Sequence, residues 1–238
     1  MKRIIALVLM IVMLVTLVAC GKDKDKPNND GTNTGNDITS STNNDNKDND
    51  IVNVSITIDS VKNAKETDAS LFEYEDVEGG ISITKYNGSD EIVSVPNSID
   101  DKSVVSIGAS AFVNCSTVIG LKLADSVVTV EEKAFLNCKS MKVLVTGTAL
   151  RTISTYGFGN CTSLTDVELN DGLQELKRSS FGFTNIKKIE IPSSVTVIES
   201  PFTKQTDGKL IVVGEVGSSI EQYVNEKGAE YNIEFQAK

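Results

Sequence analysis

Apolar residues recur along this chain in short clusters separated by polar turns, and the clusters repeat at an interval of 23 residues. One series consists of phenylalanines: Phe112, Phe135, Phe158 and Phe181. A second series keeps the interval with other apolar residue types: Val118, Met141 and Leu164. Clusters of two or three apolar residues predict short strands, since a helix needs a longer periodic segment. A fixed interval of this length is typical of a solenoid, whose units stack because one unit cannot bury its apolar face alone.

The repeat predicts a mainly β fold with short turns. About five units occupy residues 71–205, and the strands of successive units should pair in parallel, about 4.8 Å apart. Equivalent side chains then form columns, so that the phenylalanines make one buried ladder. We expect the last unit to be irregular, because Pro201 precedes Phe202 and the spacing shortens there.

Both ends of such a stack require a cap, since they would otherwise expose apolar surface and strand edges. Residues 51–70 are the expected amino-terminal cap, with a strand at 51–59 where apolar and polar residues alternate. Residues 206–238 are the expected carboxy-terminal α/β cap. There Ser218 should begin a short helix that ends at Gly228, and a strand should follow at 231–235.

The motifs around the phenylalanines are specific in sequence. Ala111-Phe112 is followed by Cys115, and Ala134-Phe135 is followed by Cys138. With the strand segment 189–198, this pattern resembles the BspA-type leucine-rich repeat of bacterial surface proteins over residues 71–235. Thr184 departs from it, because a cysteine would be expected there. The resemblance implies a leucine-rich repeat solenoid attached to a bacterial surface, with host matrix proteins or other cell-surface molecules as typical partners.

The first 19 residues have the organisation of a secretory signal peptide, with a basic start at Lys2 and Arg3 and a long apolar run. The run is shorter than most membrane-spanning helices, which disfavours a retained span. Residues 17–21 resemble the lipobox of bacterial lipoproteins, which implies that Cys20 is lipidated and becomes the first residue. A plain signal peptide with an accidental cysteine is the alternative. We therefore expect an exported, outward-facing protein, anchored by lipid to the bacterial cell membrane.

Composition adds two expectations. Residues 20–50 comprise the lipidated cysteine and a polar segment with too little apolar surface to fold, which predicts a disordered tether. The chain has a formal charge of −10, and removal of residues 1–19 would leave 21 basic against 33 acidic residues, or −12. An acidic surface disfavours nucleic acid as a partner. The expected partners are an extracellular protein or polysaccharide, with the membrane contacted through the anchor at Cys20.

Residues suited to catalysis are scarce. The chain contains no histidine, so the commonest general base and zinc ligand are missing. Cys115, Cys138 and Cys161 could form a thiolate metal site, but buried column positions explain them better. Carboxylate pairs such as Asp166 with Glu168 could serve glycoside hydrolysis, but pairs of this kind are expected in any acidic chain. We predict no enzyme activity, no catalytic residues, no metal site and no cofactor.

The outward face of the strand column is the candidate site for a partner. Its members combine apolar residues with flanking lysines: Ile119, Lys122, Lys142, Val143, Val145, Lys187 and Lys188. Exposed apolar residues bordered by charge are typical of a binding surface. Alternatively, the two valines satisfy strand propensity or pack under a neighbouring loop.

These observations predict a surface-anchored, non-catalytic binding module that acts in adhesion or protein–protein interaction with host or neighbouring-cell molecules. A structural scaffold of the cell envelope is one alternative. A solute-binding lipoprotein of a transporter is another, and it would have two lobes with long helices between strands. The short repeat and the shortage of helical segments disfavour that second alternative.

Overall fold

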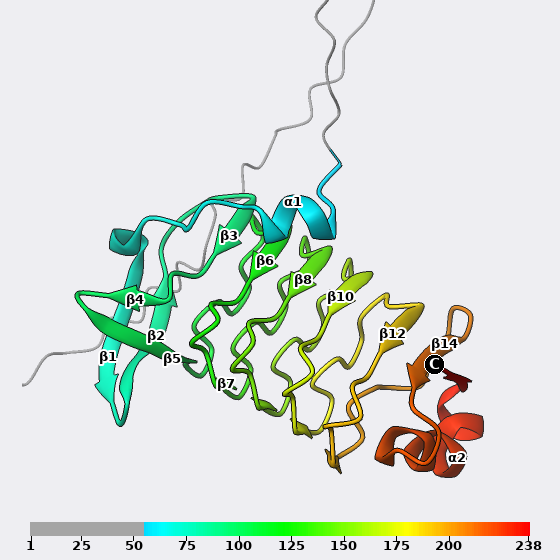
Figure 1. Cartoon of the computed structure of the whole chain (residues 1–238). Helices are drawn as coiled ribbons and strands as arrows, with labels where there is room; N and C mark the ends of the chain where they lie inside the picture. Colours follow the sequence, from blue (N-terminus) through cyan, green and yellow to red (C-terminus); the bar gives the residue numbers. More distant parts are fainter. Residues whose placement is uncertain (1–54) are drawn as a thin grey trace, which may run out of the picture.

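The computed structural model describes residues 55–238, and they form a mainly β, parallel solenoid of about seven turns with a short carboxy-terminal helix (Figure 1). The predicted fold is confirmed. The number of turns exceeds the five units counted in the sequence, because strands before and after the regular repeat continue the stack. The predicted signal peptide, Cys20 and the tether lie outside the described residues.

One column of strands runs along one side of the solenoid. Its members are β3 (Ile92–Ser94), β6 (Gly120–Lys122), β8 (Val143–Val145), β10 (Asp166–Glu168), β12 (Lys188–Glu190) and β14 (Leu210–Gly214). The first four form a parallel sheet in the order β10-β8-β6-β3, and the last two form a second sheet with β15 (Ile233–Ala237). The column follows the chain order, as Figure 1 shows.

The second column lies across the core from the first. Its members are β2 (Gly80–Tyr86), β5 (Lys102–Ile107), β7 (Thr129–Val130), β9 (Thr152–Ile153), β11 (Glu175–Leu176) and β13 (Val197–Ile198). Residues 23 apart are partners, as in the pairs Thr129 with Thr152 and Thr152 with Glu175. The strand β1 (Phe72–Val77) pairs antiparallel with β2, and β4 (Ser98–Ile99) pairs antiparallel with β5. The hairpin of β1 and β2 therefore ends this sheet.

The predicted phenylalanine ladder fills the core between the columns. Consecutive ring centroids lie 4.6 Å apart from Phe112 to Phe135, 4.9 Å from Phe135 to Phe158 and 5.6 Å from Phe158 to Phe181. Phe202 continues the ladder at 6.4 Å from Phe181, so the shortened last unit still places its aromatic ring in the column. The rings are buried and stacked, which stabilises each pair beyond the area that it buries.

An asparagine ladder runs along the turns. Asn114, Asn137 and Asn160 all adopt the left-handed conformation, with φ of 59°, 64° and 57°. Their side chains bond to one another: Asn137 Nδ2 donates to Asn114 Oδ1 at 2.8 Å, and Asn160 Nδ2 donates to Asn137 Oδ1 at 2.6 Å. Asparagine tolerates positive φ better than most residues, which explains its recurrence here.

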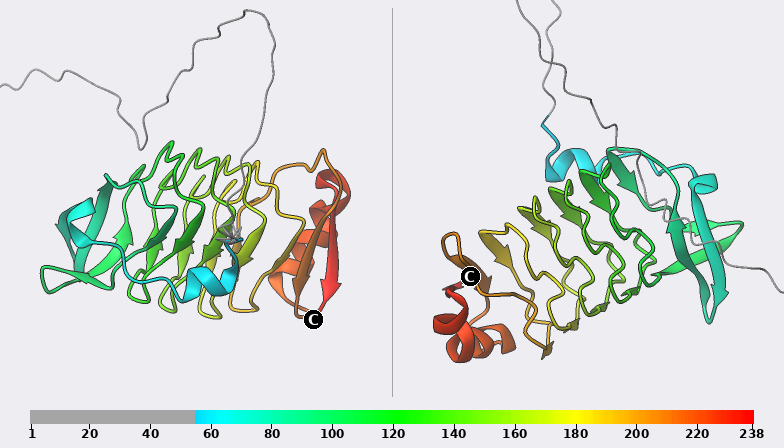
Figure 2. Two further views of the ribbon diagram at one scale, coloured as in Figure 1. Left: turned by 90° about the horizontal axis from the view of Figure 1, so that it is seen from above. Right: turned by 180° about the vertical axis from the view of Figure 1, so that it is seen from behind.

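The amino-terminal segment differs from the prediction. The expected strand at 51–59 is wrong for residues 55–59, because α1 (Ile58–Lys62) begins there. Thr57 caps the helix, and the side chains of Thr57 and Ser60 bond reciprocally to each other's backbone, as in a capping box. The helix lies against the outer face of the first column instead of closing the end of the stack (Figures 1 and 2). A 3-10 turn, η1 (Ala69–Leu71), then leads into β1.

The carboxy-terminal cap contains α2 (Ser219–Tyr231) and β15. Ser218 is the N-cap as predicted, with its hydroxyl accepting from the backbone of Glu221. The predicted end at Gly228 is wrong, because the helix continues to Tyr231 and ends at Asn232 in the left-handed conformation. Gly228 instead permits close packing, since a Cβ there would lie 2.6 Å from the carbonyl oxygen of Ile233.

Candidate binding surface

The outward side chains of the first column form two straight rows. One row contains Ile92, Gly120, Val143 and Asp166, and the other contains Ser94, Lys122, Val145 and Glu168. Side chains of a strand alternate between the two faces, so the intervening residues point into the core. Each row therefore ends in a carboxylate at β10, and the row of Ser94 also carries Lys122 on β6.

The apolar part of the two rows is covered by α1. Val61, Val143 and Val145 form a buried cluster with exposures of 0%, 1% and 5%, and Ile56, Ile58 and Ile92 pack against it. The prediction that Val143 and Val145 form an exposed patch is therefore wrong. The alternative, in which the two valines pack under a neighbouring loop, is closer to the structure. The covering segment is a helix, α1, which lies near the amino-terminal end of the described residues.

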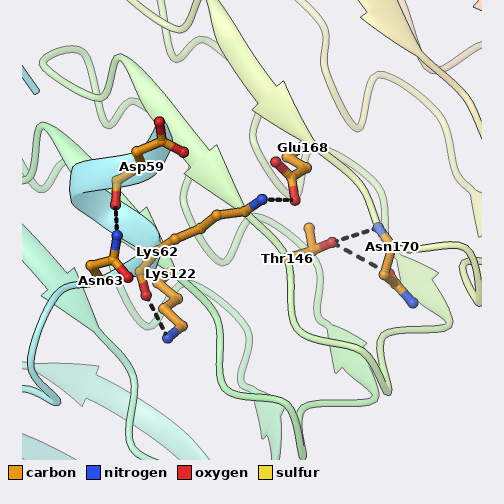
Figure 3. Close-up of polar contacts among 7 residues, drawn as sticks. All are labelled: Asp59, Lys62, Asn63, Lys122, Thr146, Glu168 and Asn170. Carbon is orange, nitrogen blue, oxygen red and sulfur yellow. Dashed lines mark hydrogen bonds and ion pairs between the residues drawn. The ribbon is translucent and has the colours of Figure 1, made fainter. Parts of the chain in front are cut away.

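Polar contacts fix α1 in place (Figure 3). Lys62 Nζ lies 2.7 Å from Glu168 Oε1, which links the end of the helix to β10. Lys122 Nζ donates to the backbone carbonyl of Lys62 at 2.9 Å, where a cation also complements the negative end of the helix. Asn63 Nδ2 donates to the carbonyl of Asp59 at 2.9 Å. Lys122 thus binds the helix in this structure.

The remaining predicted residues separate into two places. Ile119 is half-buried and Lys142 is exposed beside it, with the backbone N–H of Lys142 donating to the carbonyl of Ile119 at 2.8 Å. Lys187 is exposed and its ammonium group donates to the carbonyl of Asp207. Lys188 is exposed on the outward row of β12, in register with Ile211 of β14. The seven residues therefore do not form one continuous patch.

Beyond the end of α1, the uncovered face is acidic. We call this region the acidic shelf and define it by Asp166, Glu168, Asp171 and Glu190. Glu190 pairs with Lys238 at 2.6 Å, and this hydrogen bond raises the pKa of the Lys238 ammonium group. The shelf presents carboxylates on a rigid strand backbone next to the exposed Lys188.

Two open hollows lie along the acidic shelf. One has a volume of about 480 Å³ and is lined by residues that include Thr146, Asn170 and Gly172. The other has a volume of about 330 Å³ and extends from Ile58 of α1 to Pro192. Both are lined by Glu168, Leu169 and Asp171. Their volumes fall within the range of about 300–1,000 Å³ that is common for ligand sites.

Hydrogen bonds hold the floor of the larger hollow. The backbone N–H of Asn170 donates to Thr146 Oγ1 at 2.9 Å (Figure 3). Asn170 Nδ2 donates to the carbonyls of Thr148 and Leu150 at 3.0 and 3.2 Å. Residues 170–172 were not among the predicted site residues. Their position directly after an outward strand is the signal that could have placed them at a site.

The cysteines form a third buried column. Cys115, Cys138 and Cys161 are reduced thiols with no exposed surface. Cys138 Sγ donates to the carbonyl of Phe112 at 3.1 Å, and Cys161 Sγ donates to that of Phe135 at 3.2 Å. Burial raises the pKa of the Cys138 thiol well above its usual value, which disfavours the thiolate that a metal would require. The side chains therefore serve packing.

Within residues 55–238, no group of three or more histidine, cysteine, aspartate or glutamate side chains is arranged to hold a metal ion. No helix in the same range is both long enough and apolar enough to cross a membrane.

Comparison with known families agrees with this architecture. The family model for the BspA type leucine-rich repeat region matches residues 87–207 as six copies, which is just over half of the chain. The chain belongs to the BspA-type leucine-rich repeat family. Proteins built from leucine-rich repeats are typically non-catalytic binding scaffolds. The BspA-type repeats of this chain supply the first column from β3 to β12, and therefore most of the outward face.

Solved structures show the same fold. A leucine-rich repeat protein of T. pallidum is 26% identical, with a TM-score of 0.57 over 63% of this chain and 71% of that chain. The pneumococcal vaccine antigen PcpA is 13% identical, with a TM-score of 0.50 over 69% of this chain and 47% of that chain. No curated protein matches the chain.

Proposed function

We propose that this BspA-type repeat chain is a non-catalytic binding module of a bacterial surface, held there through lipidated Cys20, and that it takes part in adhesion or protein–protein interaction. The family assignment and the solenoid support a binding role. The export and the anchor rest on the resemblance of residues 17–21 to a lipobox.

The observation that carries the proposal is the acidic shelf beside α1. Three of its four carboxylates, those of Asp166, Glu168 and Glu190, project from parallel strands whose positions are fixed by backbone hydrogen bonds, so little ordering is required when a partner binds. The apolar part of the same face is already covered by α1. The partner that best fits the shelf is an extracellular protein with a basic surface, because complementary charge accelerates encounter and selects the partner.

The alternatives make different demands on the molecule. A transporter's solute-binding protein would have two lobes around a cleft, whereas residues 55–238 form one solenoid with a short helix at its carboxy-terminal end. An envelope scaffold would use the same fold without a saturable ligand outside its own envelope. Binding to an external partner is the property that separates a scaffold from an adhesin.

The test is binding of the chain from residue 21 to a panel of immobilised extracellular matrix proteins. The variant Asp166→Lys/Glu190→Lys reverses two charges of the acidic shelf without touching Val143 or Val145. The control variant Glu75→Lys/Glu78→Lys makes the same change in net charge at the β1–β2 hairpin, at the other end of the stack. We expect saturable binding that the shelf variant weakens at least tenfold and the control leaves unchanged. Equal binding by both variants would exclude the shelf.

The anchor has its own test. Mass spectrometry of the mature chain from the producing cell should show an amino-terminal residue Cys20 that carries acyl groups. The Cys20→Ser variant should lose this modification and leave the membrane fraction. An unmodified amino terminus, or membrane association that is unchanged in Cys20→Ser, would remove lipid anchoring from the proposal.

A further inference from the structure

Phe183 occupies the place in its unit that asparagine holds in the three preceding units. It stands 23 residues after Asn160 and has the same left-handed backbone, with φ of 58°. The asparagine ladder of Asn114, Asn137 and Asn160 therefore stops where an aromatic ring begins. A bulky residue rarely adopts positive φ, and such outliers concentrate at functional sites.

The exposure of Phe183 is also exceptional. All eight phenylalanines of the chain lie within the described residues, and Phe183 is the only one that is exposed, with 58% of its surface accessible. The neighbouring Phe181 is buried in the core ladder. The left-handed backbone at this place recurs in each unit and belongs to the turn, but folding alone does not explain why an exposed phenylalanine replaces asparagine there.

Phe183 borders a hollow of about 450 Å³. Ten residues line this hollow, and nine of them are polar. The polar groups include the amide of Asn185, the hydroxyl of Thr162 and the carboxylate of Asp207. Residues 162 and 183–187 precede β10 and β12. Apart from Ile58, the hollows of the acidic shelf are lined by residues in the later part of β10 and β12 or by residues that follow β8, β10 and β12. The Phe183 hollow thus lies at the opposite ends of these strands.

The walls of the hollow are held by hydrogen bonds before any ligand arrives. The backbone N–H of Phe183 donates to Thr203 Oγ1 at 2.9 Å, and Gln205 Nε2 donates to the carbonyl of Thr203 at 2.8 Å. The backbone N–H of Gln205 donates to the carbonyl of Tyr231 at 2.9 Å, which ties this segment to the end of α2. Lys187 joins the same wall through its bond to the carbonyl of Asp207.

We propose that the Phe183 hollow is a carbohydrate site, in which a neutral pyranose ring of an oligosaccharide stacks on the phenyl face. An exposed aromatic face binds the C–H face of a sugar ring, and amide, hydroxyl and carboxylate groups around it bind the sugar hydroxyls. A protein partner would require an apolar centre with several large side chains. Phe183 is the only large apolar side chain among the residues that line this hollow. The site does not depend on the acidic shelf.

The position offers a variant that tests binding without endangering the fold. Phe183→Asn restores the residue found at this place in the three preceding units, in a backbone conformation that asparagine tolerates. Thermal unfolding should show a Tm equal to or higher than that of the unaltered chain. Phe183→Trp keeps an aromatic face and, because the chain has no tryptophan, introduces a single fluorescent reporter.

The experiment uses the chain from residue 21 and four neutral probes: cellotetraose, maltotetraose, chitotetraose and mannotetraose. Saturation-transfer NMR should detect binding of at least one probe, and Phe183→Asn should abolish the signal. The tryptophan emission of Phe183→Trp should shift saturably with the same probe. The proposal is overturned if no probe binds, if Phe183→Asn binds equally well, or if Phe183 is required only for capture of the matrix proteins used above. Because Asp166→Lys/Glu190→Lys leaves this hollow intact, the two proposals can fail separately.

Discussion

Gly120 lies directly beneath Val61: a Cβ on Gly120 would come within 2.5 Å of Val61 Cγ2. The next nearest atom, Ile56 Cγ2, would be 3.1 Å away. Glycine therefore occupies the outward row of β6 because α1 rests on the strand at this point. The equivalent residue on β8 is Val143, which contacts the same helix from the neighbouring rung.

Substitution of this glycine should loosen the helix. We expect Gly120→Ala to lower the free energy of unfolding by about 1–3 kcal/mol, as is usual for overpacking of a tight contact. Hydrogen exchange measured by mass spectrometry should show faster exchange in residues 55–63 and unchanged exchange in the strands of the second column.

A second substitution separates a local contact from a general effect of the added methyl group. Val61→Ala removes the side chain that Gly120→Ala would strike, so the double variant should be less destabilised than the sum of the two single variants by at least about 0.5 kcal/mol. Strictly additive effects would show that α1 does not depend on the approach of Val61 to Gly120.

The buried thiol of Cys138 predicts a dependence of stability on alkaline pH. Its pKa is raised in the folded state by burial, from an ordinary value of 9.0. The contribution of the protonated thiol to the free energy of unfolding is fully present below pH 9. It falls as pH rises, because the unfolded chain then releases a proton that the folded chain keeps. Urea unfolding should show a loss of about 1.4 kcal/mol between pH 8 and pH 10.

The Cys138→Ala variant is the control for this titration, and its stability curve should be flatter by about the same amount. Measurement below pH 10 limits the contribution of Tyr223, whose pKa burial raises from an ordinary value of 10.0. If the two proteins lose the same stability over this interval, the thiol of Cys138 is not the group responsible.

The asparagine ladder stabilises the fold in two ways, through a residue type that tolerates positive φ and through side-chain hydrogen bonds. Two substitutions of Asn137 should separate these contributions to the free energy of unfolding. Asn137 has positive φ, donates to Asn114 and accepts from Asn160. Asn137→Ala should destabilise the fold by about 2–3 kcal/mol, since it loses both bonds and strains a left-handed residue. Asn137→Gly loses the bonds without the strain and should cost about 1 kcal/mol less. Chemical unfolding measures both values, and equal costs would mean that strain is unimportant here.

The aromatic ladder predicts that the cost of removing a ring depends on its place in the stack. Phe158 stacks on both neighbours, with centroids at 4.9 and 5.6 Å, whereas among the described residues Phe202 stacks on Phe181 alone, at 6.4 Å. Phe158→Ala should cost about 3–5 kcal/mol, and Phe202→Ala clearly less. Denaturant unfolding of the two variants checks the order, and the reverse order would contradict a ladder stabilised by neighbouring rings.

The stack could be predicted from the sequence because each unit imposes the same requirements at the same places. Phe112, Phe135 and Phe158 stand at a constant interval, and parallel pairing converts that interval into a buried column. Phe202 also joins the column, although the shortened spacing predicted an irregular last unit. Ser218 was also found correctly, because an N-cap is a local requirement of the helix that follows it.

The amino-terminal helix could not be predicted, because its apolar pattern fits two structures. Ile56 and Ile58 alternate as in a strand, yet both pack against the valine face while the capping box at Thr57 starts a helix. The burial of Val143 and Val145 could not be predicted either, because the segment that covers them lies about 80 residues earlier and leaves no local signal. Gly228 misled for a different reason: its close approach to Ile233 is a tertiary contact, not a helix end.

The candidate sites were predictable only in part. The outward position of Lys188 follows from the strand alternation, whereas the hollows depend on turns whose geometry the sequence does not specify. Phe183 is intermediate between these cases. Its departure from the asparagine series is visible in the sequence, but its exposure and the hollow beside it come from the three-dimensional arrangement.

The attachment of α1 has a mechanical consequence. Among the described elements, α1 is the first that a pulling force applied at residue 55 would reach. It is held by the apolar contacts of Ile56, Ile58 and Val61, by the ion pair of Lys62 with Glu168, and by the hydrogen bond from Lys122 to the carbonyl of Lys62. These contacts can break one after another, whereas the ladder bonds of a solenoid turn must break together. Tension on this end would therefore detach the helix while the stack stays folded, and it would convert a covered valine surface into an accessible one.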